Sequence, residues 1–414
     1  MAGLEAAEAL LRQLFDLAVA TADPMRVVAQ HLPPRPKGRL VVIGAGKASA
    51  RMAEAVEAHY GPCEGLVITR YGYGRPCQGI EIVEAAHPVP DAAGEAATAR
   101  ILALLRGLGP EDFVLALISG GGSALLCAPA FGMTLAEKQA VNARLLASGA
   151  PISAMNLLRK HLSEVKGGQL AAASPAPMLA LMISDVPGDD PGLIASGPTV
   201  GEASTAAEAL AVADRWAVAL PEAARLGLSK GSGVVPPGDV RLARVENRVI
   251  AAPAQSLAAA KQAAEAAGCE VMLLGDALEG EAREVGRAQA VQAKALTRRD
   301  VPVLLLSGGE LTVTRRGDGS GGPNAEFCLA AALELAGAAG IYVLAGDTDG
   351  VDGAAEVAGA CFGPDILSRA AGAEAALAIN DSHGYFGRAG AQIVTGPTLT
   401  NVNDFRAILV MPQG

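Results

Sequence analysis

Aromatic residues are scarce in this chain, since 7 Phe, 5 Tyr and 1 Trp make up only 3% of its 414 residues. Alanine and 50 glycines dominate instead, a composition typical of α/β proteins with tightly packed helices and many glycine turns. The length exceeds what one hydrophobic core usually supports, and the 51% of hydrophobic residues is ample for two cores. We therefore expect two α/β domains.

Metal-binding and membrane-spanning patterns are also lacking. The 6 cysteines never form C-x-x-C, and the 5 histidines never pair at metal-ligand spacing, so the cysteines are expected to be reduced thiols. No apolar run is long enough to cross a bilayer, and residues 1–24 have the spacing of an amphipathic helix rather than of a signal peptide. The sequence predicts a soluble cytoplasmic protein.

Positive charge is in deficit, because 33 Lys and Arg face 43 Asp and Glu, giving a net charge of −10. This balance argues against a general nucleic-acid-binding surface and against an anionic-membrane surface. A bound anion would have to be held by local geometry. The expected ligand is therefore small.

The first such geometry lies in residues 39–57, RLVVIGAGKASARMAEAVE. A buried strand at 40–43 runs through Gly44 and Gly46 into a helix that opens with Lys47. Glycines let the backbone approach a ligand, a helix start offers unpaired N–H groups, and the lysine adds a full positive charge. This turn is predicted to bind an anion.

This turn matches the known glycine-rich loop motifs only in part. A dinucleotide-binding G-x-G-x-x-G loop needs Gly or Ala at position 49, where the chain has Ser49. A Walker A loop is excluded because it needs Gly at Val41 and Ser or Thr at Ala48. The alternative of an ordinary strand-to-helix turn with an exposed lysine stays open.

The first part of the chain repeats the order strand, turn, helix. Short apolar strands at 66–69, 80–84 and 113–118 alternate with helical patterns, which predicts a parallel sheet with its ligands at the carboxyl ends of the strands. The turn after the last of these strands is expected to form a nest of N–H groups for a carboxylate or phosphate. It contains Ser119, Gly120, Gly121, Gly122 and Ser123. The sequence argues against a hydrolase elbow here, because Leu125 stands where that motif requires glycine.

Basic and acidic side chains follow in neighbouring segments. Arg159, Lys160 and Lys166 lie on or after a predicted helix and are either a solvated face or phosphate-binding groups. Asp185 and Asp189 follow a buried strand at 179–183, where carboxylates hold Mg²⁺, accept a proton or cap a helix. Lysines and aspartates together are the groups that phosphoryl transfer requires.

The composition of segment 227–240 predicts a linker, and a second α/β unit is expected to begin with a strand at 247–252. The turn Ser307 to Glu310 repeats the earlier Ser-Gly-Gly pattern, and Asn324 lies at a helix start after Pro323. Residues 347–352 supply only part of an EF-hand loop, so a carboxylate-rich loop is the preferred interpretation.

These motifs together resemble those of the class II glycerate 2-kinases, whose C-terminal part is the MOFRL domain. The resemblance is carried along nearly the whole chain by GAGKAS, HPVPD, SGGGSALL, NLLRKHLSEVKGGQLA, ISDVPGDDPGLIASGPT, SGGELTVT, GDTDGVDG, NDSHGYF and TGPTLTNVND. It implies a Rossmann-like three-layer domain at 1–235 with a mainly parallel sheet, and a second α/β domain at 245–414 containing the MOFRL region at about 300–410. The active site would lie in the cleft between them.

The activity that the resemblance implies is transfer of the ATP γ-phosphoryl group to the 2-hydroxyl of D-glycerate with Mg²⁺. Lys47 resembles the family's active-site lysine, and Asp189 resembles the acidic residue opposite it. Pro323 stands where many members have arginine, so Arg159, Lys160 or Lys166 would have to supply that charge, and Leu399 stands in place of an expected glycine.

In the mechanism that we expect, Lys47 and the N–H groups beside it bind the transferring phosphoryl group, and residues 119–123 bind the glycerate carboxylate. Asp189 orients or deprotonates the 2-hydroxyl. Asp185, Glu310 or Asp347 would hold Mg²⁺, and Gly44, Gly46 and Asn324 complete the candidates for substrate or phosphate binding. The expected partners are D-glycerate and ATP, with a second copy of the chain optional, and neither nucleic acid nor membrane.

Two other functions compete with the kinase. Relatives are often named hydroxypyruvate reductases, which would bind NAD(P)H at the incomplete G-x-G-x-x-G turn. Against this, Ser49 interrupts the fingerprint, and no acidic residue follows at the usual distance. The second competitor is a non-catalytic sugar-acid-binding protein, in which the gathering of Lys and Asp at strand ends is unexpected.

Overall fold

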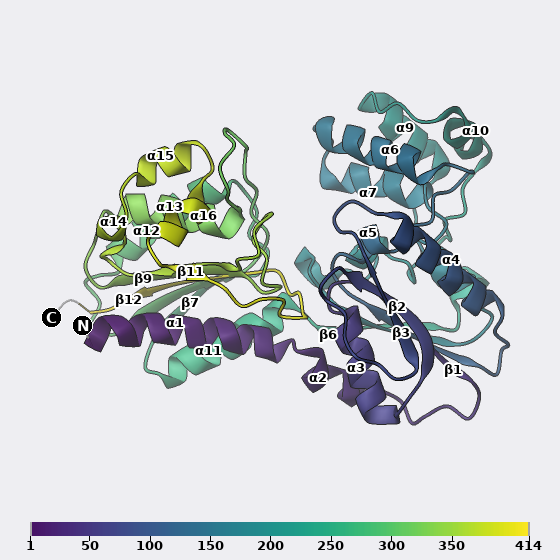
Figure 1. The fold of residues 1–414 in the computed structure, drawn as a ribbon, viewed down its shortest axis with the longest axis horizontal. Helices are drawn as coiled ribbons and strands as arrows, with labels where there is room; N and C mark the ends of the chain where they lie inside the picture. Colours follow the sequence, from purple (N-terminus) through teal and green to yellow (C-terminus); the bar gives the residue numbers. More distant parts are fainter. Residues whose placement is uncertain (1, 413–414) are drawn as a thin grey trace. The chain divides into compact units, whose positions relative to one another are not determined.

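The computed structural model describes residues 2–412 and divides into two units (Figure 1). The first unit comprises Pro24–Ser184 and Asp189–Ile250. The second comprises the chain up to Asp23, Asp185–Gly188 and the chain from Ala251 onward. Each unit is built on a six-stranded sheet with helices, which confirms the predicted α/β fold class.

The sheet of the first unit has the strand order β3-β2-β1-β4-β5-β6. Its strands are β1 (Leu40–Ala45), β2 (Glu64–Arg70), β3 (Ile80–Ala85), β4 (Phe113–Ile118), β5 (Met178–Ile183) and β6 (Val245–Ala251). The pairs from β3 to β5 are parallel. In the register of β1 with β4, Ala45 lies opposite Ile118, so the two glycine turns leave neighbouring strands at the same edge, as predicted.

The helices of the first unit are α2 (Pro24–Val27), α3 (Ser49–Tyr60), α4 (Ala92–Arg106), α5 (Gly122–Leu125), α6 (Leu135–Ala147), α7 (Ile152–His161), α8 (Gln169–Ala172), α9 (Ala206–Arg215) and α10 (Glu222–Lys230). Its short 3-10 turns are η1 (Val28–His31), η3 (Ile194–Ser196) and η4 (Val240–Leu242), while η2 (Pro187–Asp189) spans the boundary between the two units. Capping boxes begin α6 at Thr134 and α9 at Thr205. Helices α6, α7, α9 and α10 share a separate apolar cluster.

The sheet of the second unit is mixed, with the order β11-β10-β9-β12-β8-β7. Its strands are β7 (Glu270–Gly275), β8 (Val303–Ser307), β9 (Ile341–Asp347), β10 (Gly359–Phe362), β11 (Gln392–Ile393) and β12 (Asp404–Val410). Strand β12 is antiparallel to both β8 and β9. The carboxyl ends of β8 and β9 therefore lie at the same edge as the start of β12, where Asp404 pairs with Asp347.

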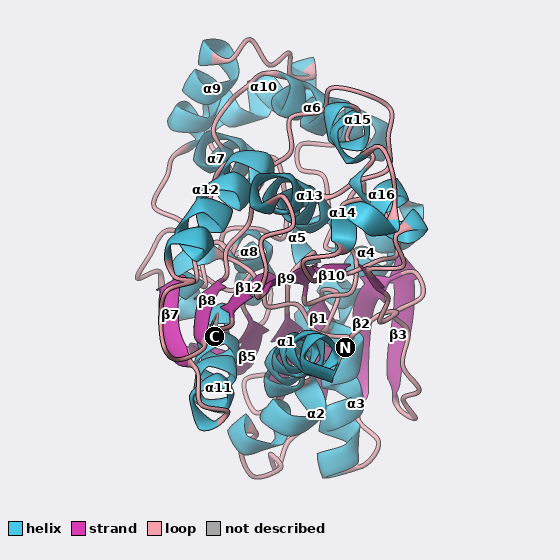
Figure 2. Ribbon diagram, turned by 90° about the vertical axis from the view of Figure 1, so that its left-hand side faces the viewer, coloured by secondary structure: helices cyan, strands magenta, loops and turns pink. Residues whose placement is uncertain are grey.

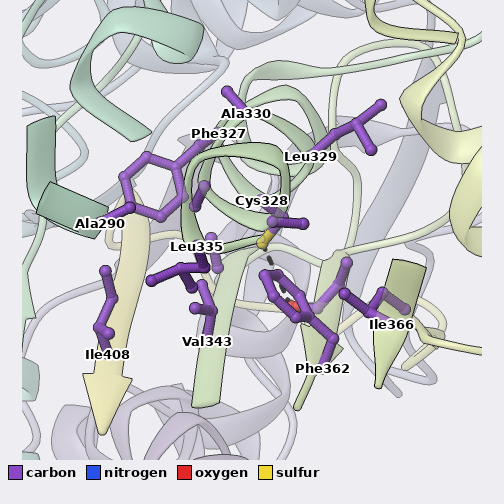
Figure 3. Packing of buried hydrophobic residues seen from close by; sticks show 14 of the residues in the cluster. Ala290, Phe327, Cys328, Leu329, Ala330, Leu335, Val343, Phe362, Ile366 and Ile408 are labelled. Atoms are coloured by element: carbon purple, nitrogen blue, oxygen red, sulfur yellow. Dashed lines mark hydrogen bonds between the residues drawn. The ribbon is translucent and has the colours of Figure 1, made fainter. Parts of the chain in front are cut away.

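Helices cover both faces of this second sheet (Figure 2). They are α1 (Ala2–Thr21) and α11 (Pro253–Ala266) on one face, and α12 (Ala282–Ala295), α13 (Pro323–Leu335), α14 (Ile366–Arg369), α15 (Ala373–Ala378) and α16 (Ser382–Arg388) on the other. Figure 3 shows the buried α13 against the sheet, with Phe327 and Leu335 packed near Val343 and Ile408. Because α13 is apolar on nearly every side, it forms the centre of this core.

Two segments, α1 and β6, belong to other units than the predicted domain ranges assign them to. Helix α1 packs with α11 and β9 of the second unit, because the apolar side of this amphipathic helix contributes Leu11 and Phe15 to that core. The strand expected to open the second domain is β6, which closes the first sheet beside β5. Among the described residues, no helix has the length and apolar character needed to span a membrane.

Candidate functional site

The first glycine turn connects β1 to α3 and needs glycine for steric reasons. A Cβ atom on Gly44 would lie 2.3 Å from the carbonyl oxygen of Leu117. Gly46 has a φ of +147°, and a Cβ there would lie 2.0 Å from the Ser119 hydroxyl oxygen. Strand β4 packs against Gly44 and the second turn packs against Gly46, each so closely that a side chain would not fit.

The N–H groups of this first turn are used inside the protein. Gly46 N–H donates to Ile68 O at 3.1 Å, and Lys47 N–H donates to Gly120 O at 2.8 Å. The Ala48 N–H donates to Ser119 Oγ at 3.0 Å. Our expectation that these N–H groups bind the anion is therefore wrong, and the half-buried Lys47 side chain is the group that this turn offers.

The second glycine turn, residues 119–123, keeps several N–H groups available. Ser119 and Gly122 donate to Ala45 O and Ser119 O, both at 3.2 Å. Within residues 2–412, no acceptor is found for the N–H groups of Gly120, Gly121 and Ser123. Gly121 adopts a φ of +80°, and these three N–H groups are the donors that the predicted nest would use; the nest itself stays a prediction.

The Lys47 side chain passes this second turn. A Cβ on Gly121 would lie 3.3 Å from Lys47 Cγ and 3.2 Å from His87 Nε2. A side chain at position 121 would therefore meet both residues. The cationic side chain and the donor nest belong to one local arrangement at the carboxyl ends of β1 and β4, which suits an anionic ligand.

The basic residues after α7 have internal partners. Lys160 Nζ forms an ion pair with Glu202 at 2.5 Å and is only 6% exposed. Lys166 is 2% exposed and donates to Ser123 O at 2.6 Å and Leu126 O at 3.5 Å. Arg159 is partly buried and contacts Asn156 Oδ1 at 3.4 Å. Lys160 and Lys166 are therefore not solvent-facing phosphate ligands, contrary to the sequence interpretation.

Asp189 has an uncommon backbone conformation and an unpaired side-chain oxygen. Its φ is +55°, which is uncommon for a residue other than glycine. Its Oδ1 atom is buried and has no hydrogen-bond partner among residues 2–412. In contrast, the exposed Asp190 accepts the N–H of Gly192 at 2.8 Å and stabilises its own loop. The positive φ and the unpaired carboxylate oxygen distinguish Asp189 from Asp190.

Asp185 belongs to the second unit. Its Oδ2 accepts the side-chain amide of Asn401 at 3.2 Å, and its backbone oxygen accepts that of Asn403, also at 3.2 Å. These contacts fix the start of the acidic loop on the segment before β12. The residues Asn401 and Asn403 lie in the TNVND motif, and the sequence analysis assigned them no role.

The second unit also has a buried polar network that the sequence analysis missed. Asn324 Nδ2 donates to Asp404 Oδ1 at 2.7 Å, and the Asn324 N–H donates to Asp352 Oδ1 at 3.0 Å. His383 Nε2 lies 3.1 Å from Asp352 Oδ2. Arg406 pairs with Asp404 at 2.8 Å. Asn324 therefore donates hydrogen bonds to two buried carboxylates, those of Asp352 and Asp404.

Burial raises the pKa of Asp404, although Arg406 and the hydrogen bond from Asn324 act in the opposite direction. The Oδ1 atom of Asn324 has no hydrogen-bond partner in the described part of the chain. In the sequence the members of this network lie in separate segments: Asn324 at a helix start, Asp352 in GDTDGVDG, His383 in NDSHGYF and Asp404 in NVND. They become interpretable once β12 is seen to begin beside the end of β9.

The predicted metal ligands are not gathered into one group. Among residues 2–412, no three or more His, Cys, Asp or Glu side chains are grouped so that they could hold a metal ion. Glu310 is exposed, and Asp347 Oδ1 accepts the N–H of Asp349 at 2.9 Å. Asp185 is held by Asn401 as described above. These residues offer single oxygen donors, which fits Mg²⁺ only where a substrate supplies further oxygens.

Two family models match the chain. Residues 10–229 match a domain of unknown function, DUF4147, and residues 303–404 match the MOFRL family. A protein of Agrobacterium vitis with the provisional name hydroxypyruvate reductase is 52% identical, covering 98% of this chain and 94% of that protein. A D-glycerate 2-kinase of Thermotoga maritima is 36% identical, covering 97% of each chain.

A solved structure gives the same relationship in three dimensions. The crystal structure of a glycerate kinase from Thermotoga maritima matches with a TM-score of 0.87 at 35% identity. The match covers 98% of this chain and 100% of that one. Similarity of sequence and fold therefore extends over both units.

Proposed function

We propose that this chain, which belongs to the glycerate kinase family built from the DUF4147 and MOFRL domains, phosphorylates D-glycerate at its 2-hydroxyl group. The products are 2-phosphoglycerate and ADP when ATP is the donor. The observation that carries the proposal is the similarity over nearly the whole chain to a D-glycerate 2-kinase. The reaction needs cationic or N–H groups for two anions and an acceptor for one proton.

The first unit contains backbone N–H groups and side chains suited to each role. The N–H groups of Gly120, Gly121 and Ser123 bind the glycerate carboxylate, and the Lys47 ammonium group neutralises charge on the transferring phosphoryl group. The 2-hydroxyl oxygen attacks phosphorus while its proton passes to the Asp189 carboxylate. The bond from phosphorus to the bridging oxygen breaks, and ADP leaves with the electron pair. The unpaired Oδ1 of Asp189 supports this role.

Mg²⁺ bound with ATP would supply charge neutralisation at the phosphates. Asp185, Glu310 or Asp347 would hold the ion. A Mg²⁺ site of this kind uses one or two carboxylates together with phosphate oxygens and water, so it does not require three clustered acidic side chains. Because the reaction consumes ATP and acts on a small hydroxy acid, we assign it to the cytoplasm.

The name of the Agrobacterium vitis relative makes a hydroxypyruvate reductase the second candidate. A nicotinamide dinucleotide would place its pyrophosphate against the N–H groups that follow β1. In this chain the N–H groups of Lys47 and Ala48 already have acceptors, and Ser49 Oγ lies 3.1 Å from Ser119 Oγ. This turn therefore lacks both the donors and the third glycine that the cofactor needs.

One assay separates the candidates. The purified protein is given D-glycerate, ATP and Mg²⁺ in one reaction, and hydroxypyruvate with NADH or NADPH in another. The kinase proposal expects ADP formation that depends on glycerate, and no loss of nicotinamide absorbance. Hydroxypyruvate-dependent loss of absorbance without ADP formation would contradict it. The absence of both, with tight glycerate binding, would favour the non-catalytic binding protein.

A further inference from the structure

A buried lysine lies directly beneath the second glycine turn. Lys166 is 2% exposed, and its ammonium group donates to the carbonyl oxygens of Ser123 and Leu126 at 2.6 and 3.5 Å. No acidic side chain lies within ion-pair distance of it in the described part of the chain. A buried ammonium group without a carboxylate is unfavourable for stability, so its retention calls for another reason.

The surroundings increase this unfavourable contribution. Lys138 is another buried lysine, with 6% exposure, and it donates to Leu162 O at 3.4 Å. Burial lowers the pKa of Lys166 well below its ordinary value, and the positive charges of Lys138, Arg159 and Lys160 act in the same direction, while Cys127 opposes them. Of these four basic residues, Lys160 alone has a carboxylate partner among residues 2–412, namely Glu202. The stability of this region alone does not explain a cation at position 166.

A chain of contacts leads from Lys166 to the proposed reactive lysine. Lys166 holds Ser123 O at one end of the turn. Near the other end, Gly120 O accepts the N–H of Lys47 at 2.8 Å. The Lys47 side chain in turn passes Gly121. A change in the conformation of residues 120–123 would therefore move both the donor nest and the backbone of Lys47.

The second unit contains a comparable arrangement. Its glycine turn follows β8, and the fully buried Arg406 donates to the carbonyl oxygens of Gly308 and Gly309. Arg406 differs from Lys166 in having a carboxylate partner, Asp404. In both units a buried basic side chain thus donates to a glycine turn that follows an interior strand, Lys166 to Ser123 O in one and Arg406 to Gly308 O and Gly309 O in the other.

From these contacts we propose that Lys166 is a positioning residue of the kinase, which acts through residues 120–123 to hold Lys47 and the N–H groups in their working geometry. It does not touch substrate. The proposal rests on the proposed function for its kinetic consequence, but its structural consequence is independent of any reaction. Replacing a lysine that only stabilised the fold would lower stability and activity together, whereas replacing a positioning lysine lowers activity more than it lowers stability.

The test compares K166M with K138M. Both variants remove a buried ammonium group and leave a side chain of similar length, but only Lys166 contacts the turn. K166M should keep a melting temperature close to that of the wild type, because an apolar side chain replaces a buried amine that has no carboxylate partner. Its kcat should fall about tenfold or more, since small displacements of reacting groups have large effects on rate. K138M should stay within about threefold of the wild type.

Hydrogen–deuterium exchange supplies the readout that does not depend on activity. In K166M the amides of Lys47 and Ala48, which donate to the second turn, should exchange faster than in the wild type, and in K138M they should not. Unchanged exchange in K166M, or equal losses of kcat in both variants, would overturn the proposal. If K166M does not fold, K166L carries the same comparison. A wild type without glycerate-dependent ADP formation would refute the proposed function, while the exchange result would still decide the role of Lys166.

Discussion

The hydroxyl oxygen of Ser119 lies 3.0 Å from the backbone nitrogen of Ala48, so the second glycine turn occupies a donor of the first. A turn that resembles a dinucleotide-binding loop in sequence is thereby closed to a pyrophosphate. The available N–H groups lie in the second turn instead, next to the Lys47 side chain. This arrangement favours a small oxyanion over a nicotinamide cofactor.

The closure of the first turn predicts that completing the fingerprint will not create a cofactor site. S49G supplies the missing third glycine but leaves the N–H groups of Lys47 and Ala48 bonded to the second turn. Titration of the variant with NADH and NADPH, followed by nicotinamide fluorescence, should show no saturable binding. Saturable binding to S49G or to the wild type would restore the reductase as a candidate.

The half-buried Lys47 is expected to affect catalysis more than folding. K47A removes the proposed countercharge of the transferring phosphoryl group, and kcat should fall by about a hundredfold or more. The melting temperature should change little, because the lysine is not part of an apolar core. The exposed Lys37 provides the control, and K37A should keep wild-type kinetics. Wild-type turnover of K47A would remove Lys47 from the mechanism.

Replacement of Asp189 by asparagine should lower activity without lowering stability. D189N removes the proton acceptor and should lower kcat by about a hundredfold or more. Asparagine tolerates the left-handed conformation, where Asp189 has a φ of +55°, so the variant should be at least as stable as the wild type. D190N, at the exposed neighbour, is the matched control and should retain activity. If D190N lost as much activity as D189N, the assignment of the reactive acid would be wrong.

The ion pair between Lys160 and Glu202 predicts a pH dependence of stability. Burial raises the pKa of Glu202, but hydrogen bonds from Lys160 and Ser204 outweigh burial and lower it from 4.5 to about 2. A carboxylate of lowered pKa contributes fully above its unfolded pKa, and this contribution is lost as the pH falls through the folded pKa. The pair should therefore contribute about 2 kcal/mol at neutral pH, after allowance for partial exposure, and lose it as the pH falls from 4.5 toward 2.

Denaturant titrations of the wild type and E202Q can measure this contribution. The difference in free energy of unfolding between them should be large at neutral pH and should shrink as the pH falls below 4.5. The exposed pair of Arg248 and Glu246 gives the control, and E246Q should change stability by less than about 1 kcal/mol at any pH. A difference for E202Q that is independent of pH would show that the ion pair is not its origin.

Local patterns allowed most of the fold to be predicted. The strand at 113–118 and the turns after β1 and β4 follow from short-range hydrophobic pattern and glycine placement, and the structure has them where expected. The position of α1 could not be predicted, because an amphipathic helix does not specify which sheet its apolar side covers. Strand β6 was assigned to the wrong sheet for a similar reason, since a turn-rich segment looks like a domain linker.

The candidate site was harder to predict because its contacts join distant residues. The sequence around Lys160 and Lys166 is typical of a basic surface. In the structure both are buried, and their partners, Glu202 and the carbonyl oxygen of Ser123, lie about forty positions away in the sequence. The hydrogen bond from the Ala48 N–H to Ser119 Oγ joins residues that are 71 positions apart in the sequence. Arg406 and Asp404 were missed because a charged pair inside a strand has no distinctive pattern in sequence.

The position of the new phosphate ester tests the central claim most directly. The phosphorus-31 spectrum of the product, formed from D-glycerate, ATP and Mg²⁺, distinguishes a phosphate on carbon 2 from one on carbon 3, because the first couples to a single proton and the second to a methylene pair. We expect a doublet that grows with enzyme and is lost with K47A. A triplet, or no glycerate-dependent phosphate ester at all, would contradict the assignment as a glycerate 2-kinase.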